Sequence, residues 1–139
     1  EAIFAALEKE VRLKGGGRIF IEETKAFVAV DVDTGDDRGN GSISRLNEEA
    51  AIEIARQIRL RNLSGKIIVD FAGSSEYRYM KPVLEVLERE VAKDPIRTHV
   101  VGLSRAGNVE IIRIRRRPSL SDVMSVECPT CKGTGRVEK

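Results

Sequence analysis

The stretch Arg18–Asp33, RIFIEETKAFVAVDVD, decides the fold of this chain. It predicts two β-strands joined by a tight polar turn at Glu22–Lys25, and the second strand, Ala26–Asp33, is rich in β-branched residues. Side chains alternate between the two faces of a strand, so three valines of the second strand form one apolar face. Asp31 and Asp33 therefore lie together on the opposite face.

The sequence on either side adds helices and further strands. Upstream, Ala2–Val11 has apolar residues at helical spacing, and Gly15–Gly17 ends that predicted helix in a turn. Downstream, the sequence predicts a glycine-rich loop (Thr34–Ser44), a helix (Asn47–Asn62) with Asn47 as its N-cap, and a buried strand (Lys66–Phe71). A second helix follows, led by Ser75 and Glu76, and Pro82 either kinks it or marks its start. The last two predicted strands are Thr98–Ser104 and Asn108–Arg116. This order indicates an α/β (α+β) fold, in which helices pack on a mixed sheet.

The composition fits one folded domain with a short appendage. Of the 139 residues, 41% are apolar and 33% are charged, and there is no tryptophan, so the core must consist of aliphatic side chains. No run approaches the roughly 18 apolar residues of a membrane span. The charged first residues do not resemble a signal peptide, so we expect a cytoplasmic protein. A chain that begins at Glu1 suggests an excised or trimmed piece.

Two aspartates at strand ends are the best candidates for a metal site. Asp31 and Asp70 each lie near the end of an apolar strand that a loop follows, although aspartate is depleted in strands. Mg²⁺ suits such a pair because it usually takes one or two protein carboxylates and keeps several waters. The alternative is that each aspartate caps a helix or pairs with an arginine. Two such positions beside a glycine-rich loop favour the metal.

Basic residues are clustered although the net charge is only +2. Such local clusters attract phosphates, but each of them is equally consistent with a solvated surface. One cluster follows the middle helix (Arg56, Arg59, Arg61) and the other ends the last strand (Arg113, Arg115, Arg116, Arg117).

Other kinds of active site find little support. The single histidine, His99, lies in a strand pattern without a nucleophile signature, so it predicts no catalytic triad. The glycine-rich loop lacks the order of residues of a phosphate-binding P-loop.

Both cysteines, Cys128 and Cys131, lie in the segment ECPTCKGTG. A C-x-x-C turn presents two thiolates to one metal, and structural zinc takes four ligands. The chain offers no other cysteine, so either a second copy completes a shared zinc site and forms a homodimer, or the pair is a redox dithiol. The proline, glycine and threonine around the pair favour zinc. We therefore divide the chain into a catalytic metal-binding subdomain (1–122) and a zinc-link knuckle (123–139).

Three segments together resemble the catalytic core of the ribonuclease E/G family. They are FVAVDVD (27–33), EEAAIEIARQIRLRNLSGKIIVDF (48–71) and CPTCKGTG (128–135), and they occur in the order that the family shows. The resemblance runs from about residue 5 to the C-terminus. It implies a deoxyribonuclease-I-like subdomain and endonucleolytic cleavage of single-stranded RNA.

The resemblance also implies roles for individual residues. Asp31 and Asp70 correspond to the two aspartates that bind Mg²⁺ in the family, and CPTC corresponds to the link in which two protomers share one Zn²⁺. An arginine that receives the RNA 5′ end corresponds to Arg97. The family's RNA-binding S1 domain and the first part of its catalytic core lie upstream of the residues that match.

The chain also departs from the family pattern. Asp33 stands where the family commonly has asparagine, which either adds a third acidic group or weakens the orientation of the attacked phosphate. The loop after it is shorter than usual, and FAGSS (71–75) lacks an acidic residue that often follows the second aspartate.

The hypothesis from sequence is a metal-dependent ribonuclease. A Mg²⁺ ion on Asp31 and Asp70 activates a water that attacks a phosphodiester. We expect Asp33 to orient that water, and Arg113 and Arg115 to hold the RNA backbone. The alternatives are a non-catalytic RNA-binding module and a structural unit that dimerises through the zinc knuckle.

Overall fold

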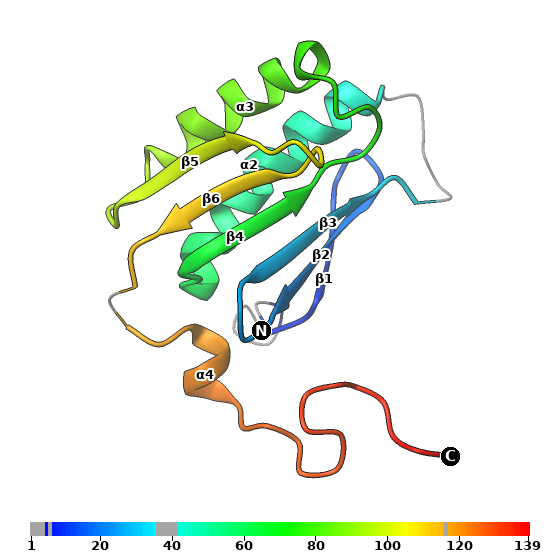
Figure 1. Ribbon diagram of the computed structural model, residues 1–139, viewed down its shortest axis with the longest axis vertical. Coiled ribbons are helices and arrows are strands. Elements are labelled where there is room, and N and C mark those ends of the chain that lie inside the picture. Colours follow the sequence, from blue (N-terminus) through cyan, green and yellow to red (C-terminus); the bar gives the residue numbers. More distant parts are fainter. Residues whose placement is uncertain (1–4, 6, 36–41, 116) are drawn as a thin grey trace.

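The computed structural model describes residues 5, 7–35, 42–115 and 117–139. Within these residues the chain forms a six-stranded mixed sheet and three helices, which confirms the expected fold class (Figure 1). The strand order across the sheet is β1-β2-β3-β4-β6-β5. The strands are β1 (Glu10–Arg12), β2 (Arg18–Glu23), β3 (Val28–Asp33), β4 (Gly65–Asp70), β5 (Thr98–Leu103) and β6 (Val109–Arg113), and the helices are α2 (Ile43–Arg61), α3 (Tyr77–Val91) and α4 (Leu120–Met124). No described helix is long and apolar enough to cross a membrane.

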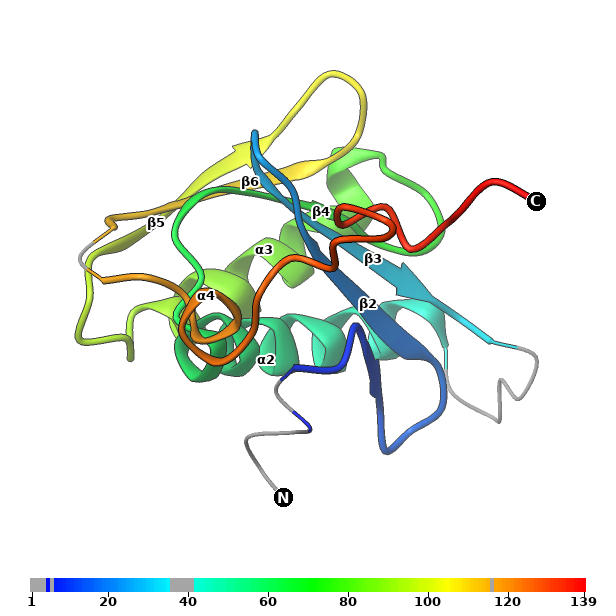
Figure 2. The same ribbon diagram turned by 90° about the horizontal axis from the view of Figure 1, so that it is seen from below.

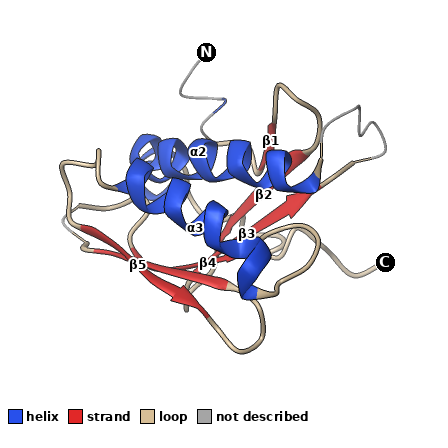
Figure 3. Ribbon diagram, turned by 90° about the horizontal axis from the view of Figure 1, so that it is seen from above, coloured by secondary structure: helices blue, strands red, loops and turns tan. Residues whose placement is uncertain are grey.

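Helices α2 and α3 lie side by side on one face of the sheet, and the opposite face is open (Figure 3). Alternate residues of the central strands point toward the helices, and burial of each such aliphatic side chain contributes roughly 1.5–3 kcal/mol. The residues on the other face of the same strands are partly or fully exposed, as Ile112 at 47% shows. The core of the sheet consists of Ile19, Ile21, Val28, Val30, Val32, Ile67, Val69, Val109 and Ile111.

The two halves of the sheet meet at a parallel pair. Strands β3 and β4 are parallel, with α2 as the crossover between them, whereas the other strand pairs are antiparallel. Parallel neighbours place their carboxyl ends at the same edge of a sheet. Figure 1 shows both strands ending at this edge, here called the carboxyl edge of the sheet.

Helix α2 begins earlier than its sequence predicts. Ser42 is the N-cap, and its hydroxyl accepts a hydrogen bond from the Arg45 N–H at 3.1 Å. The prediction of Asn47 as N-cap is therefore wrong, because Asn47 lies inside the helix and is only 4% exposed. The last residues of the predicted loop, Ile43 and Ser44, belong to the helix, and 36–41 lie outside the described residues.

The predicted N-terminal helix is wrong from Leu7 onward, whereas Ala5 is helical as predicted. Glu10 and Val11 belong to β1, and Val11 pairs with Ile19 of β2. The exposed edge of β2 gives this short segment main-chain partners that an isolated amphipathic helix lacks. The turn that follows contains Gly17 at φ +84°, where a Cβ would lie 2.8 Å from the carbonyl oxygen of Asp33. The remaining part of the predicted helix, Ala2–Phe4 and Ala6, lies outside the described residues.

The start of α3 settles the prediction about Pro82. Helix α3 begins at Tyr77 and contains Pro82, so the proline does not mark its start. After β6 the chain leaves the sheet, and α4 with the cysteine segment lies beyond the amino ends of β3 and β4 (Figures 1 and 2).

Candidate metal centre at the carboxyl edge of the sheet

The structure places Asp31 and Asp70 directly beside each other. They are register partners at the carboxyl ends of the parallel strands β3 and β4, and both side chains are exposed on the open face. They line a shallow depression of about 480 Å³. Its other lining residues are Phe20, Glu22, Phe27, Ala29, Val30, Ile68 and Asn108.

The pair carries negative charge that no described cation neutralises. Partial burial raises the pKa of Asp31, and the charges of Asp70 and Asp33 raise it further. In the described part of the chain, the ion pairs include neither Asp31 nor Asp70. The N-cap positions of the helices that follow them are Ser42 and Glu76, so neither aspartate caps a helix. Within these residues, therefore, neither aspartate has the partner that a purely structural role requires.

Asp33 lies on the same face but has a partner. Its Oδ2 accepts from Nε of Arg18 at 3.2 Å, and the two residues face each other across β2 and β3. The described residues contain no group of three acidic, histidine or cysteine side chains able to hold one metal. The donor set is thus two carboxylates, which fits an ion that keeps most of its waters, such as Mg²⁺.

The loop after Asp70 is tied to helix α2. The side-chain amide of Asn47 donates to the carbonyl oxygen of Ala72 at 2.8 Å, and the Ala72 N–H donates back to Oδ1 of Asn47 at 3.1 Å. Gly73 follows at φ +76°, where a Cβ would lie 2.7 Å from Cγ2 of Ile43. These contacts fix the position at which β4 ends.

Asn108 is a site residue that the sequence reasoning missed. Its N–H donates to the Ser104 hydroxyl at 3.1 Å, and its carbonyl oxygen accepts from the Ser104 N–H at 2.7 Å, so the turn before β6 is closed. Because Val109 pairs with Val69 of β4, Asn108 reaches the same depression as Asp70. In the sequence, Asn108 stands just before a predicted strand. This position indicates a site residue only when β6 is known to lie beside β4.

The arginines expected to hold RNA do not lie near the two aspartates. Arg113 pairs with Gly65 at the amino end of β4, and Arg97 is joined to Ile114 at the same end of the sheet. Arg97 and Arg115 are exposed there. Arg116 of the same cluster lies outside the described residues.

Arg113 has a structural role within the buried part of the fold. Its guanidinium binds both carboxylate oxygens of Asp94, at 2.8 and 3.3 Å, and donates to Oδ1 of Asn62 and the carbonyl oxygen of Leu63. The side chains of the pair are only 3% and 2% exposed. Burial acts to raise the pKa of Asp94, but the hydrogen bonds from Arg113, Ile96 and Thr98 outweigh it and hold that pKa below its usual range. In this fold the guanidinium is unavailable to a phosphate.

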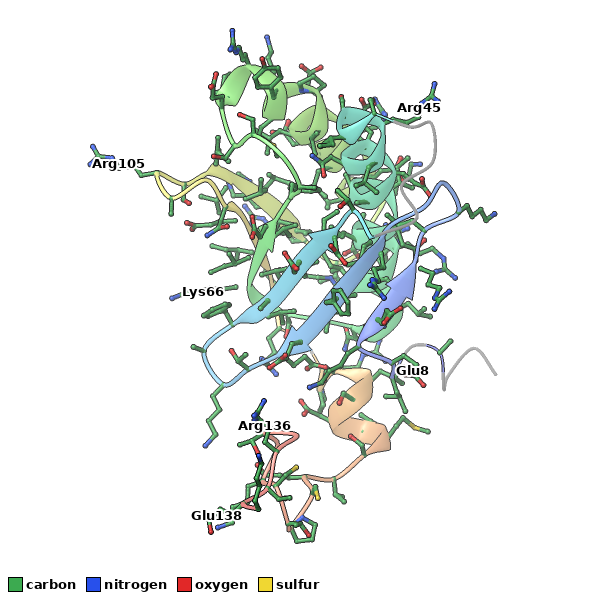
Figure 4. All side chains as sticks on the ribbon, turned by 90° about the vertical axis from the view of Figure 1, so that its right-hand side faces the viewer. Glu8, Arg45, Lys66, Arg105, Arg136 and Glu138 are labelled. Atoms are coloured by element: carbon green, nitrogen blue, oxygen red, sulfur yellow. The ribbon has the colours of Figure 1, made fainter. Side chains whose placement is uncertain are left out.

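A different set of basic residues surrounds the carboxyl edge. They lie near the amino ends of α2 and α3 and in the turn between β5 and β6, and Figure 4 shows Arg45 and Arg105 toward that end of the molecule. Their exposed side chains give a negatively charged ligand a favourable approach to the depression. This set consists of Arg45, Arg78, Lys81 and Arg105.

Cys128 and Cys131 form a compact turn on the opposite side of the molecule. The Lys132 N–H donates to the carbonyl oxygen of Cys128 at 2.8 Å, and Lys132 itself has a positive φ of 53°. Both thiols are free, and backbone N–H groups, first that of Gly135 and then that of Gly133, lower the pKa of Cys131. A thiolate is the form that binds metal, and within the described residues the turn offers only these two ligands.

Comparison with known proteins identifies the family. The sequence profile of the Ribonuclease E/G family matches residues 1–116. Ribonuclease G of Escherichia coli (strain K12) is 44% identical over 137 residues, which are 96% of this chain and 28% of that protein. Ribonuclease G of Haemophilus influenzae is 41% identical over 99% of this chain and 29% of its own length. Ribonuclease E of E. coli (strain K12) is 40% identical over 97% of this chain and 13% of its own length. The chain therefore spans less than a third of these relatives, and it belongs to the ribonuclease E/G family.

Proposed function

We propose that this chain is the metal-holding piece of the catalytic core of an endoribonuclease that cleaves single-stranded RNA in RNA processing or decay. The observation that carries the proposal is the adjacent pair Asp31 and Asp70, which has no cation partner among the described residues and lies in a chain of this family. The span of 28% of the E. coli ribonuclease G relative supports a part of a larger enzyme. In this proposal the sheet is a deoxyribonuclease-I-like subdomain.

Asp31 and Asp70 hold Mg²⁺ in this proposal. The bound ion supplies positive charge to the attacked phosphate and lowers the pKa of a bound water. The two carboxylates fix the ion at the carboxyl edge of the sheet, and Phe20 and Phe27 beside them offer ring surfaces to the bases of a single strand. Asp33 orients the attacking water with Oδ1, which accepts no hydrogen bond from the described residues.

The RNA strand extends in this proposal beyond the depression. Arg45 and Arg105 attract its phosphates near the metal, because both are exposed at the carboxyl edge. Arg97 and Arg115, exposed at the other end of the sheet, remain candidates for more distant contacts and for the 5′ end. Arg113 serves in the fold rather than in RNA binding, because its guanidinium is buried against Asp94.

We also propose that the segment 123–139 joins two copies. Cys128 and Cys131 from each copy give the four thiolates of a tetrahedral Zn²⁺ site, and the result is a homodimer in the cytoplasm. The lowered pKa of Cys131 supports a thiolate at this position.

The alternative proposal is a non-catalytic RNA-binding or zinc-mediated dimerisation module. The open sheet face favours an assembly role, because Val101, Ile112 and Ile114 are 41–50% exposed on it or at its margin. Such a module predicts salt-dependent RNA binding without Mg²⁺-dependent cleavage.

The deciding experiment is cleavage of a 5′-monophosphorylated single-stranded RNA oligonucleotide with and without Mg²⁺. It compares the full-length protein with its Asp31→Asn and Asp70→Asn variants and with this chain alone. The matched control is Glu85→Gln, which removes an exposed carboxylate on α3. Loss of cleavage in the two aspartate variants alone supports the proposal, and retained cleavage at ordinary Mg²⁺ concentration would exclude it.

A further inference from the structure

Three carboxylates lie close together on the open face of the sheet. Asp31 and Asp33 are two residues apart in β3, so they share a face with their Cα atoms about 6.5 Å apart. Asp70 faces Asp31 from β4. The charges of both Asp70 and Asp33 act on Asp31, in addition to its partial burial.

Arg18 separates one of these carboxylates from the other two. It lies directly opposite Asp33 in the antiparallel pair of β2 and β3, and its Nε donates to Oδ2 of Asp33 at 3.2 Å. Both side chains are partly covered, with 36% and 40% of their surface exposed. Asp31 and Asp70 form no ion pair with any described residue.

The guanidinium of Arg18 is itself held from two further directions. Nη1 lies 3.5 Å from Oε2 of Glu10 on the edge strand β1. The guanidinium carbon lies 5.5 Å from the centre of the Phe20 ring, and Phe20 is the register partner of Asp31. These contacts limit the freedom of Arg18, so Asp33 pairs with a positioned charge rather than with a mobile surface side chain.

The number of carboxylates that are free to bind the ion affects which metal the site prefers. Mg²⁺ is commonly held by one or two carboxylates and keeps several waters, whereas Ca²⁺ accepts six to eight oxygen ligands in a flexible arrangement. A third free carboxylate would therefore favour the larger ion. We propose that Arg18 is a positioning residue that keeps Asp33 from becoming a ligand of the ion and thereby makes the site selective for Mg²⁺ over Ca²⁺. This inference rests on the proposed binding of a divalent cation by Asp31 and Asp70.

The test is a cycle of variants in this chain: Arg18→Gln, Asp33→Asn and the double variant. Mn²⁺ is the probe, its free concentration is followed by electron paramagnetic resonance, and Mg²⁺ and Ca²⁺ are the competitors. We expect Arg18→Gln to raise the affinity for Ca²⁺ about tenfold relative to that for Mg²⁺, the effect of one added carboxylate near the ion. The double variant is expected to return to the selectivity of the unmodified chain.

Two controls separate this role from simpler effects. Arg12→Gln removes a neighbouring arginine that also pairs with Glu10, at 3.5 Å, but has no contact with Asp33 among its ion pairs. It is expected to leave the selectivity unchanged. Arg18→Lys keeps the positive charge without the guanidinium, and an intermediate selectivity is expected. It also provides the test if Arg18→Gln does not fold, as judged by circular dichroism.

The outcomes distinguish the two proposals. An equal gain in Ca²⁺ affinity for Arg18→Gln with and without Asp33→Asn would show a general charge effect and overturn the role of Arg18. The same conclusion follows if the Arg18 variants keep the Mg²⁺ preference while Mn²⁺ binding still requires Asp31 and Asp70. Mn²⁺ binding that is insensitive to Asp31→Asn and Asp70→Asn would instead overturn the metal site itself, and the role of Arg18 with it.

Discussion

Asn47 of helix α2 holds the main chain of Ala72 by two hydrogen bonds, one to its carbonyl oxygen at 2.8 Å and one from its N–H at 3.1 Å. Ala72 follows Asp70 by two residues, so a buried side chain of the helix layer fixes the end of the strand that carries a candidate metal ligand. The link between the core and the site is therefore a side chain without any direct part in the proposed chemistry.

Replacement of Asn47 by alanine removes both bonds. We expect Asn47→Ala to lower the free energy of unfolding by about 2 kcal/mol, because a partly buried N–H and C=O lose their partner. Urea unfolding measures this change, and Mn²⁺ titration should show weaker binding because Asp70 is less well placed. Asn47→Asp keeps the acceptor but loses the donor, so an intermediate loss is expected. An Asn47→Ala variant with unchanged stability and unchanged Mn²⁺ affinity would contradict this account.

The buried pair of Arg113 and Asp94 predicts a structural rather than a functional phenotype. Arg113→Met leaves the charge of Asp94 buried without its partner, and we expect a loss of about 3–5 kcal/mol in the free energy of unfolding. The exposed neighbour Arg115 is the matched control, and Arg115→Met should change stability by less than about 0.5 kcal/mol. Chemical denaturation measures both. If the Arg113→Met chain is as stable as the unmodified chain but binds RNA more weakly, Arg113 contacts RNA instead of stabilising the fold.

The same pair gives a pH dependence. The pKa of Asp94 is lower in the folded chain than in the unfolded chain, where it is about 3.9. The pair therefore stabilises the fold above the unfolded pKa, and this contribution is lost as the pH falls through the folded pKa. We expect the urea midpoint to fall steeply below about pH 4, and to fall less steeply in the Asp94→Asn/Arg113→Met variant. Equal slopes in the two chains would show that other carboxylates cause the acid sensitivity.

The sequence predicts well what depends on local pattern. The hairpin of β2 and β3 follows from β-branched residues and a polar turn, and the shared face of Asp31 and Asp33 follows from the period of two. The burial of Arg113 was also open to prediction, because the same period places it with Val109 and Ile111, which are apolar. Arg113 was predicted to contact RNA because of its positive charge, although its place on the same face as these apolar residues indicated burial.

Features that depend on the order of the strands in the sheet could not be predicted from local sequence patterns. Asn108 reaches Asp70 only because β6 lies next to β4, and Val11 becomes a strand residue only because β2 has a free edge. Asn47 is a common N-cap residue, and nothing in its neighbourhood in sequence points to Ala72, 25 residues away. Tertiary contacts decide each of these positions.

The raised pKa of Asp31 predicts that the candidate site costs the fold some stability. Removing one of the two facing charges should relieve their repulsion, so Asp31→Asn should raise the free energy of unfolding without metal by a few tenths of a kcal/mol, since exposed charges are screened. Mg²⁺ should raise the melting temperature of the unmodified chain and not of Asp31→Asn. Thermal unfolding with and without Mg²⁺ measures both effects. Equal Mg²⁺ stabilisation of the two chains would place the ion elsewhere.

The cysteine turn predicts an oligomeric state that depends on metal. Because each copy offers only Cys128 and Cys131 among its described residues, a four-thiolate site needs two copies. We expect Cys128→Ser to convert a dimer into a monomer in light scattering and to remove bound zinc, with no change in the Mn²⁺ affinity of the Asp31 site. Thr130→Ala in the same turn is the matched control and should keep the dimer. A Cys128→Ser dimer with unchanged mass would move the interface to another surface, such as the open face of the sheet, where Ile112 is exposed.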